Sequence, residues 1–254
     1  MSFRVAIPAR FASTRLPGKP LIPLAGKTML EHVYLRAQES GAEEVVIATD
    51  DERVRATAES FGARVVLTSS DHASGSDRIA EVADLLAWGD DDIVVNLQGD
   101  EPLTPPVIVA QVAINLAAHP AASISTLCAP ITTAGQLLDP HIVKVVRDAN
   151  EFALYFSRAP IPWERDPMDV ENEGVHHACY RHIGLYAYRV GYLKEYARQE
   201  ACELETIERL EQLRALWYGA KIHVGVAEEQ PGHGVDTPDD VATVEALLLA
   251  RDDE

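Results

Sequence analysis

The chain has 254 residues, of which 47% are hydrophobic and 24% charged, and its formal net charge is −18. This length allows a substantial core, in one large α/β domain or two small ones. The acidic balance excludes a general nucleic-acid-binding face, and no apolar run approaches the roughly 20 residues that span a bilayer. The cysteines Cys128, Cys179 and Cys202 are far apart, odd in number and lack metal-ligand spacing. They favour reduced thiols in a cytoplasmic protein.

Up to about residue 120, short apolar runs alternate with amphipathic segments. The expected strands are 5–8, 44–49, 64–67 and 93–98, and the expected helices are 28–40, 51–61, 76–88 and 105–119. Ser76 is a plausible N-cap of the third helix. Continuous apolar strands between helices predict a mostly parallel sheet that helices cover on both faces.

The pattern changes after residue 120, where strands follow one another with few helices between them. We expect strands at 123–131, 142–147, 153–157, 183–188 and 221–226, and helices at 203–218 and 237–251. The stripe Leu204, Ile207, Leu210, Leu213 and Trp217 has helical spacing and is expected to face the core. The predicted architecture is a single domain over 1–254, with a smaller β-rich lobe formed by about 120–200. The polar, acidic segment 164–177 is the best candidate for a mobile excursion.

The loop at 9–20 holds three cations, Arg10, Arg15 and Lys19, directly after the first strand. Gly18 allows the backbone to turn closely around a ligand. A basic loop at this place favours phosphate binding, although each cation alone also fits a solvated surface loop. A P-loop is excluded because Leu21 stands where its upstream glycine would be, and no strand is followed by G-x-G-x-x-G.

Two acidic segments could hold Mg²⁺ opposite a triphosphate. Asp100 and Glu101 lie at the carboxyl end of the strand 93–98, where open α/β sheets bind ligands, but they could also be simple turn residues. Asp236 comes just before the last helix, where it or Thr237 could instead be the N-cap. If Asp236 converges with Asp100, the pair forms a two-carboxylate Mg²⁺ site.

Further polar residues of the second half suit recognition of a carboxylate or of hydroxyl groups: Arg158, Arg181 and His182. The adjacent His176 and His177 would point to opposite sides of a strand, which disfavours zinc. Glu211 and Gln212 lie off the apolar stripe of their helix, so they are either solvated or turned into a pocket.

Eight segments carry a resemblance to a known family: IPARFASTRLPGKPL, HASGSDR (72–78), NLQGDEP (96–102), KVV (144–146), LYFSRAPIPW (154–163), RHIGLYAYR (181–189), LEQLRALWYG (210–219) and GHGVDTPDD (232–240). Together and in this order they resemble the 3-deoxy-manno-octulosonate cytidylyltransferases. These bacterial enzymes activate the lipopolysaccharide sugar 3-deoxy-manno-octulosonate (Kdo).

The resemblance implies a nucleotidyltransferase fold of the glycosyltransferase-A-like kind with a dimerisation lobe, hence a homodimer. It also implies the reaction of CTP with Kdo to give CMP-Kdo and pyrophosphate, without nucleic acid or membrane insertion. The nucleotide-binding residues that it implies are Pro8, Ala9, Arg10, Ser13, Arg15, Lys19, Ala73, Ser74, Gly75, Arg78 and Gln98. The Kdo-binding residues would be Gln98, Arg158, His182, Tyr186, Glu211 and Gln212. Asp100 and Asp236 would hold Mg²⁺ and, with Arg15 and Lys19, would be the catalytic residues.

Three alternatives stay open at this point. The acceptor could be a related sugar acid such as 8-amino-Kdo or a sialic acid. The chain could be a nucleotide-binding protein without catalytic activity, although Lys19, Asp100 and Asp236 argue against this. A glycosyltransferase would use a finished nucleotide sugar and would release no pyrophosphate from CTP.

Overall fold

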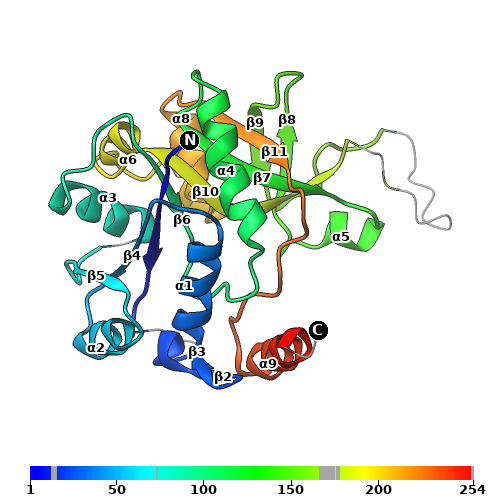
Figure 1. Cartoon of the computed structure of the whole chain (residues 1–254). Helices are drawn as coiled ribbons and strands as arrows, with labels where there is room; N and C mark the ends of the chain where they lie inside the picture. The colour runs from blue at the N-terminus through cyan, green and yellow to red at the C-terminus, as the bar shows by residue number, and fades with distance from the viewer. Residues whose placement is uncertain (13–15, 73, 166–174, 176–177, 253–254) are drawn as a thin grey trace.

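A sheet of nine strands crosses the centre of the computed structural model, which describes residues 1–12, 16–72, 74–165, 175 and 178–252 (Figure 1). The strands of this sheet are β1 (Arg4–Pro8), β4 (Glu44–Thr49), β5 (Arg64–Leu67), β6 (Ile93–Asn96), β7 (Ile124–Pro130), β8 (Lys144–Arg147), β9 (Ala153–Ser157), β10 (Tyr180–Arg189) and β11 (Ile222–Val226). A separate two-stranded sheet pairs β2 (Pro23–Leu24) with β3 (Lys27–Thr28). The helices are α1 (Met29–Glu39), α2 (Glu52–Ser60), α3 (Gly75–Leu85), α4 (Pro106–Ala118), α5 (Ala134–Leu138), α6 (Val190–Tyr196), α7 (Glu203–Glu208), α8 (Gln212–Trp217), α9 (Pro238–Asp252) and the short 3-10 helix η1 (Lys19–Leu21).

The main path of the sheet has the order β11-β7-β10-β6-β1-β4-β5. Its strands pair in parallel except β10, which runs antiparallel to both of its neighbours, β6 and β7. The predicted mostly parallel sheet is therefore confirmed. Because β1 and β6 are parallel neighbours, the loops that follow them leave the same edge of the sheet, where ligands of such folds bind.

Alternating side chains of the strands divide the core between the two faces of the sheet. Val5 and Ile7 of β1 belong to a cluster with apolar residues of α1, α2 and α4. Ala6, between them, belongs to a second cluster with residues of α3, α6 and α8. Helices thus cover both faces, as the continuous apolar strands of the first half predict.

The segment 120–200 contributes strands to the central sheet and also forms a part that branches off from it. Its strands β7 and β10 lie within the main path of the sheet, beside β6. The strands β8 and β9 branch off: β8 pairs with β10 and with β9, and α5 extends to the same side (Figure 1). The predicted lobe of about 120–200 thus includes strands of the central sheet as well as this branch.

The predicted single helix over 203–218 is wrong. Arg209 adopts a left-handed conformation with φ 54°, and it separates the short helices α7 and α8. The two helices therefore do not continue one apolar stripe. Leu213 is buried, whereas Ile207 is 77% exposed and Trp217 is 54% exposed.

The N-cap predicted for the third helix is also wrong, by two residues. The Ser74 side chain accepts a hydrogen bond from the Asp77 backbone N–H, and the Asp77 carboxylate accepts one from the Ser74 N–H. This reciprocal capping box satisfies two N–H groups that the start of a helix leaves without partners. Ser76 lies inside the first turn of α3 and is buried.

Within the described residues, none of the helices combines the length and the apolarity that crossing a membrane requires. The three cysteines are free thiols, and all of them are buried.

Candidate active site

Lys19 brings together the two carboxylates that the sequence singled out. It opens η1 directly after Gly18, whose φ of +71° is one that residues with a Cβ rarely adopt. Its ammonium Nζ lies 2.6 Å from Asp100 Oδ2 and 3.2 Å from Asp236 Oδ1. Lys19 itself is buried, with 9% of its surface exposed. Loops far apart in the sequence therefore meet around one cation.

The start of α9 leaves the Asp236 carboxylate available for this contact, because Thr237 is the capping residue. Thr237 Oγ1 accepts a hydrogen bond from the Asp240 backbone N–H at 3.4 Å. The Asp240 carboxylate in turn accepts hydrogen bonds from the backbone N–H groups of Asp236 and Thr237. This capping box decides between the two interpretations of Asp236: its side chain is not the N-cap.

The loop carrying Asp236 packs directly on the loop carrying Asp100. The backbone N–H of Val235 donates to the carbonyl of Asp100 at 2.9 Å. A Cβ on Gly232 would overlap the Leu103 side chain and lie 2.6 Å from its carbonyl oxygen. A Cβ on Gly234 would lie 2.9 Å from Glu101 Oε1. Gly232 is therefore needed for the close approach that sets Asp236 beside Asp100, whereas a Cβ on Gly234 would require only the end of the Glu101 side chain to shift.

Glu101 adds a third carboxyl group behind this pair. Burial raises the pKa of Glu101 to about 7, and the negative charges of Asp100 and Asp236 act in the same direction. The positive charge of Lys19 opposes the rise. The site thus concentrates negative charge in a partly dehydrated place, which favours a bound cation.

The donor set fits a hard divalent cation. Carboxylate oxygens are the ligands that Mg²⁺ prefers, and it commonly takes one or two of them together with phosphate oxygens and water. Asp100 and Asp236 already converge on a positive group, the Lys19 ammonium. In the described part of the chain, no cluster of three or more histidine, cysteine or acidic residues is arranged to hold a metal by itself. Phosphate oxygens would have to complete the coordination.

A cavity of about 320 Å³ opens at the edge of the sheet, on the side of α3 and α8. It gathers five residues predicted to bind sugar or nucleotide: Gly75, Gln98, Tyr186, Glu211 and Gln212. Burial raises the pKa values of both the Tyr186 hydroxyl and the Glu211 carboxyl, and the charge of Asp77 raises that of Glu211 further. These groups offer hydrogen-bond donors and acceptors, which suits the hydroxyl groups of a sugar.

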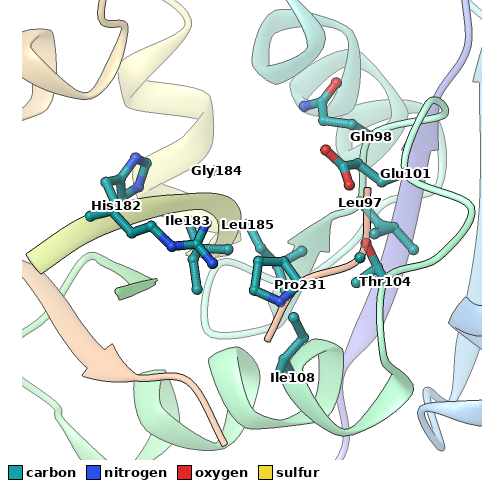
Figure 2. A pocket seen from close by; sticks show the side chains of 12 residues that line it. Leu97, Gln98, Glu101, Thr104, Ile108, His182, Ile183, Gly184, Leu185 and Pro231 are labelled. Carbon is teal, nitrogen blue, oxygen red and sulfur yellow. The ribbon is translucent and has the colours of Figure 1, made fainter. Parts of the chain in front are cut away.

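A second cavity, of about 200 Å³, also has Gln98 in its lining (Figure 2). Figure 2 shows Gln98 and Glu101 along one side of it and His182 along the other. The His182 Nε2 atom lies 3.0 Å from Thr126 Oγ1, and burial lowers the pKa of His182 to about 3. His182 is therefore neutral at pH 7 and could contact a ligand through hydrogen bonds but not through charge.

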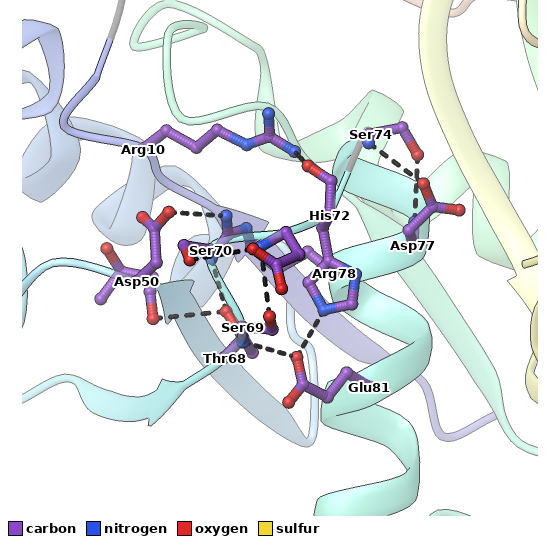
Figure 3. A network of polar contacts seen from close by, with 12 residues as sticks. Arg10, Asp50, Thr68, Ser69, Ser70, His72, Ser74, Asp77, Arg78 and Glu81 are labelled. Carbon is purple, nitrogen blue, oxygen red and sulfur yellow. Dashed lines mark hydrogen bonds and ion pairs between the residues drawn. The ribbon is translucent and has the colours of Figure 1, made fainter.

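The end of β1 and the start of α3 form the side of the site expected to bind the nucleotide. A Cβ on Gly75 would lie 3.2 Å from the Pro8 ring and 3.6 Å from Gln98 Nε2. The Arg10 guanidinium donates to the carbonyl of His72 at 2.5 Å, which ties the basic loop to the segment before α3 (Figure 3). Ala9, next to Arg10, is buried. Pro8, Gly75 and Gln98 are thus brought together as predicted.

Two predicted ligand-binding arginines have protein partners instead. Arg78 is completely buried, and it donates to Thr68 Oγ1 at 2.5 Å and to Asp50 Oδ2 at 3.2 Å (Figure 3). Arg158 donates through Nε to the carbonyl of Glu208 at 2.9 Å and through Nη1 to that of Pro140 at 3.0 Å. Neither arginine lines the cavity next to Glu211.

Three predicted site residues, Ser13, Arg15 and Ala73, lie outside the described residues, as does most of the segment 164–177. The structure also adds residues that the sequence did not indicate. Asn96, Ser76, Tyr188 and Arg209 line the larger cavity. Nothing in the sequence signals that Arg209 would break a helix and reach a cavity. Glu101, in contrast, was singled out together with Asp100.

Comparison with known proteins agrees with this geometry. A family model described as cytidylyltransferase matches residues 5–222. The 3-deoxy-manno-octulosonate cytidylyltransferase of Thioalkalivibrio sulfidiphilus is 64% identical over 98% of this chain and 100% of its own length. That of Coxiella burnetii is 55% identical over the same shares.

A solved structure of CMP:2-keto-3-deoxy-manno-octonic acid synthetase complexed with CTP is 40% identical to this chain. It covers 99% of this chain and 100% of its own, with a TM-score of 0.89. The likenesses to these three proteins extend over nearly the whole chain, whereas the family model ends before the loop that carries Asp236. The chain therefore belongs to the cytidylyltransferase family, and within it to the 3-deoxy-manno-octulosonate cytidylyltransferases.

Proposed function

We propose that this chain transfers the CMP group of CTP to the anomeric hydroxyl of Kdo, producing CMP-Kdo and pyrophosphate for lipopolysaccharide synthesis. One observation carries the proposal. Asp100 and Asp236 meet on Lys19, at the same edge of the sheet as the cavity lined by Gln98 and Glu211. A cation site for a triphosphate thus borders a polar cavity for an acceptor.

In this proposal, the basic loop holds the triphosphate. Arg10, Ser13, Arg15 and Lys19 contact its phosphates, and Arg15 and Lys19 stabilise the negative charge that develops on the departing pyrophosphate. Pro8, Ala9, Ser74, Gly75 and Gln98 surround the nucleoside. Arg78 supports this region from behind, through its ion pair with Asp50.

Asp100 and Asp236 would hold Mg²⁺. When bound, Mg²⁺ would withdraw charge from the α-phosphate and help to orient it. The carboxylates themselves hold that site in place relative to the loop after β1. Their joint contact with the Lys19 ammonium supports this role, because it shows that both side chains can face one cation.

Kdo would occupy the larger of the two cavities, which Gln98, Tyr186 and Glu211 line. Tyr186, Glu211 and Gln212 would bind its hydroxyl groups. Neutral His182 lines the smaller cavity, so it would add a hydrogen bond only where the ligand extends past Gln98 into that cavity. Arg158 would reach the sugar carboxylate only by exchanging one of its carbonyl partners for it. The protein's contribution to the rate is then to fix the anomeric oxygen in line with the departing pyrophosphate.

The acceptor is tested with a panel. Pyrophosphate release is measured with CTP, ATP, GTP or UTP against Kdo, 8-amino-Kdo and a sialic acid. We expect turnover with CTP and Kdo, and little release without an acceptor. Turnover with another sugar acid in place of Kdo would change the assigned acceptor. No turnover with any pair would support a nucleotide-binding protein without catalytic activity.

We also propose that the enzyme is a cytoplasmic homodimer. Large apolar side chains are exposed on β9, α7 and α8, namely Leu154, Ile207 and Trp217, and a second copy would cover them. Three buried thiols fit a reducing compartment. Light scattering on the wild type and on Ile207→Glu tests the dimer, which the substitution should weaken.

A further inference from the structure

The cation position between Asp100 and Asp236 has an occupant within the chain itself. Lys19 Nζ lies within hydrogen-bond distance of a carboxylate oxygen of each aspartate, at 2.6 Å and 3.2 Å. Only 9% of the surface of Lys19 is exposed, so its ammonium group is largely shielded from solvent. It supplies the positive charge that the two carboxylates need in order to lie close together.

A lysine is well suited to leave such a position. Its ammonium ends a flexible stem of four methylene groups and has no fixed donor geometry. The backbone of Lys19 is anchored independently of the side chain, since its N–H donates to the carbonyl of Leu16 at 3.1 Å and its carbonyl accepts from Ile22 at 3.2 Å. The side chain can therefore change partner while η1 stays where it is.

Two positive groups cannot share the same pair of carboxylate oxygens at contact distance, because they repel each other strongly in a partly dehydrated site. A divalent cation must therefore displace the Lys19 ammonium, and the displaced ammonium then needs another anion. The phosphates of a nucleoside triphosphate are such an anion. Without them, displacement would leave a buried ammonium without a partner, which is costly.

We infer that Lys19 occupies the cation position between Asp100 and Asp236 in the nucleotide-free enzyme, so that a divalent metal binds there only together with CTP, whose phosphates receive the released ammonium. This inference rests on the proposed function, because it takes the two carboxylates to be the metal ligands. It makes Lys19 a competitor of the metal before CTP binds and a partner of the triphosphate afterwards. Free metal then binds the enzyme weakly, and the metal–nucleotide complex binds well.

The inference predicts that removing the Lys19 ammonium increases the affinity of the CTP-free protein for a divalent metal. Mn²⁺, a paramagnetic stand-in for Mg²⁺, is titrated into the CTP-free protein and followed by electron paramagnetic resonance. We expect Lys19→Met to bind Mn²⁺ about tenfold more tightly than the wild type, or more, because the competing ammonium is gone. The matched control is Lys27→Met, which removes a charge from the exposed strand β3 and should leave Mn²⁺ affinity unchanged.

A second variant guards against misfolding. Lys19→Gln keeps a hydrogen-bond donor but removes the charge, and it should also bind Mn²⁺ more tightly, with a larger rise in melting temperature on adding Mn²⁺ than the wild type shows. Adding Asp100→Asn to Lys19→Gln should abolish the gain. Circular dichroism of each variant checks its folding.

Unchanged or weaker Mn²⁺ binding by folded Lys19→Met or Lys19→Gln would overturn the inference. So would tight Mn²⁺ binding at this site by the CTP-free wild type. These measurements use neither CTP nor Kdo, whereas the proposed function is tested by turnover of the wild type with both substrates. A failure of the inference about Lys19 can therefore be distinguished from a failure of the proposed function.

Discussion

Replacing Gly232 with alanine should disturb the distance between the two carboxylate loops more than any other change of comparable size. The added Cβ would overlap the Leu103 side chain and lie 2.6 Å from the Leu103 carbonyl oxygen and 2.8 Å from its carbonyl carbon. Ordinary contacts of a Cβ begin near 3.4 Å, so relief of the carbonyl-oxygen contact alone requires a movement of roughly 0.8 Å, and the overlap with the Leu103 side chain requires more. Leu103 is 2% exposed and packs in a cluster with Leu24, Met29 and Val244, so we expect the loop of residues 232–236 to be the part that moves.

That movement acts on both stability and turnover. Overpacking of a well-packed site costs about 1–3 kcal/mol of unfolding free energy. A misplacement of about 1 Å in a catalytic group can cost on the order of 100-fold in rate. We therefore expect Gly232→Ala to lower the rate of pyrophosphate release by about 100-fold, more than its loss of stability explains at a temperature where the variant is folded.

The assay is initial-rate pyrophosphate release from CTP and Kdo, with urea unfolding measured in parallel. Gly135→Ala, in α5, is the matched control because its Cβ would meet only Thr133 Oγ1, at 3.9 Å. It should keep wild-type turnover and stability. A Gly232→Ala enzyme within a few-fold of the wild-type rate would refute the idea that this glycine sets the position of Asp236.

Two further predictions concern stability. Asp50→Ala removes the carboxylate partner of fully buried Arg78 and should lower the unfolding free energy in urea by roughly 3 kcal/mol. Asp91→Ala removes an exposed carboxylate as a control and should change the unfolding free energy little. Equal stabilities of the two variants would contradict the role of the ion pair. Burial first and then the charge of His119 lower the pKa of His223 to about 4, against about 6.5 in the unfolded chain, so the unfolded state binds more protons between these values. The contribution of neutral His223 to stability is present above pH 6.5 and is lost as the pH falls towards 4. In urea unfolding, the unfolding free energy of the wild type should therefore fall by about 2–3 kcal/mol more than that of His223→Gln between pH 7 and pH 4.5. Identical falls would contradict this expectation.

Much of the α/β half could be predicted because local pattern and tertiary structure agree there. The strands 44–49 and 64–67 are found at their predicted bounds, since each is a short apolar run between clear helix signals. The meeting of Asp100 with Lys19 follows from topology, because β1 and β6 are parallel neighbours whose following loops share one edge. Whether the Asp236 side chain could join this site depended on which residue caps the last helix, and the structure shows that Thr237 does so.

Other features depend on tertiary contacts that one sequence does not reveal. Arg209 takes a left-handed conformation that its residue type disfavours, so the apolar spacing around it predicted a single helix. Arg158 was expected to bind a ligand because arginine suits carboxylates, and Arg78 because the family resemblance implied it. Their present partners, Asp50 for the first and two backbone carbonyls for the second, come from distant parts of the chain.

The arrangement of Asp100 and Asp236 around one cation is the centre of this account, and one measurement tests it most directly. Initial rates of pyrophosphate release from CTP are compared for the wild type and Asp100→Asn, at saturating Mg²⁺ and with or without Kdo. The account predicts release by the wild type only when Kdo is present, and a loss of roughly 1,000-fold or more in Asp100→Asn with the fold retained. An Asp100→Asn rate within a few-fold of the wild type would contradict it.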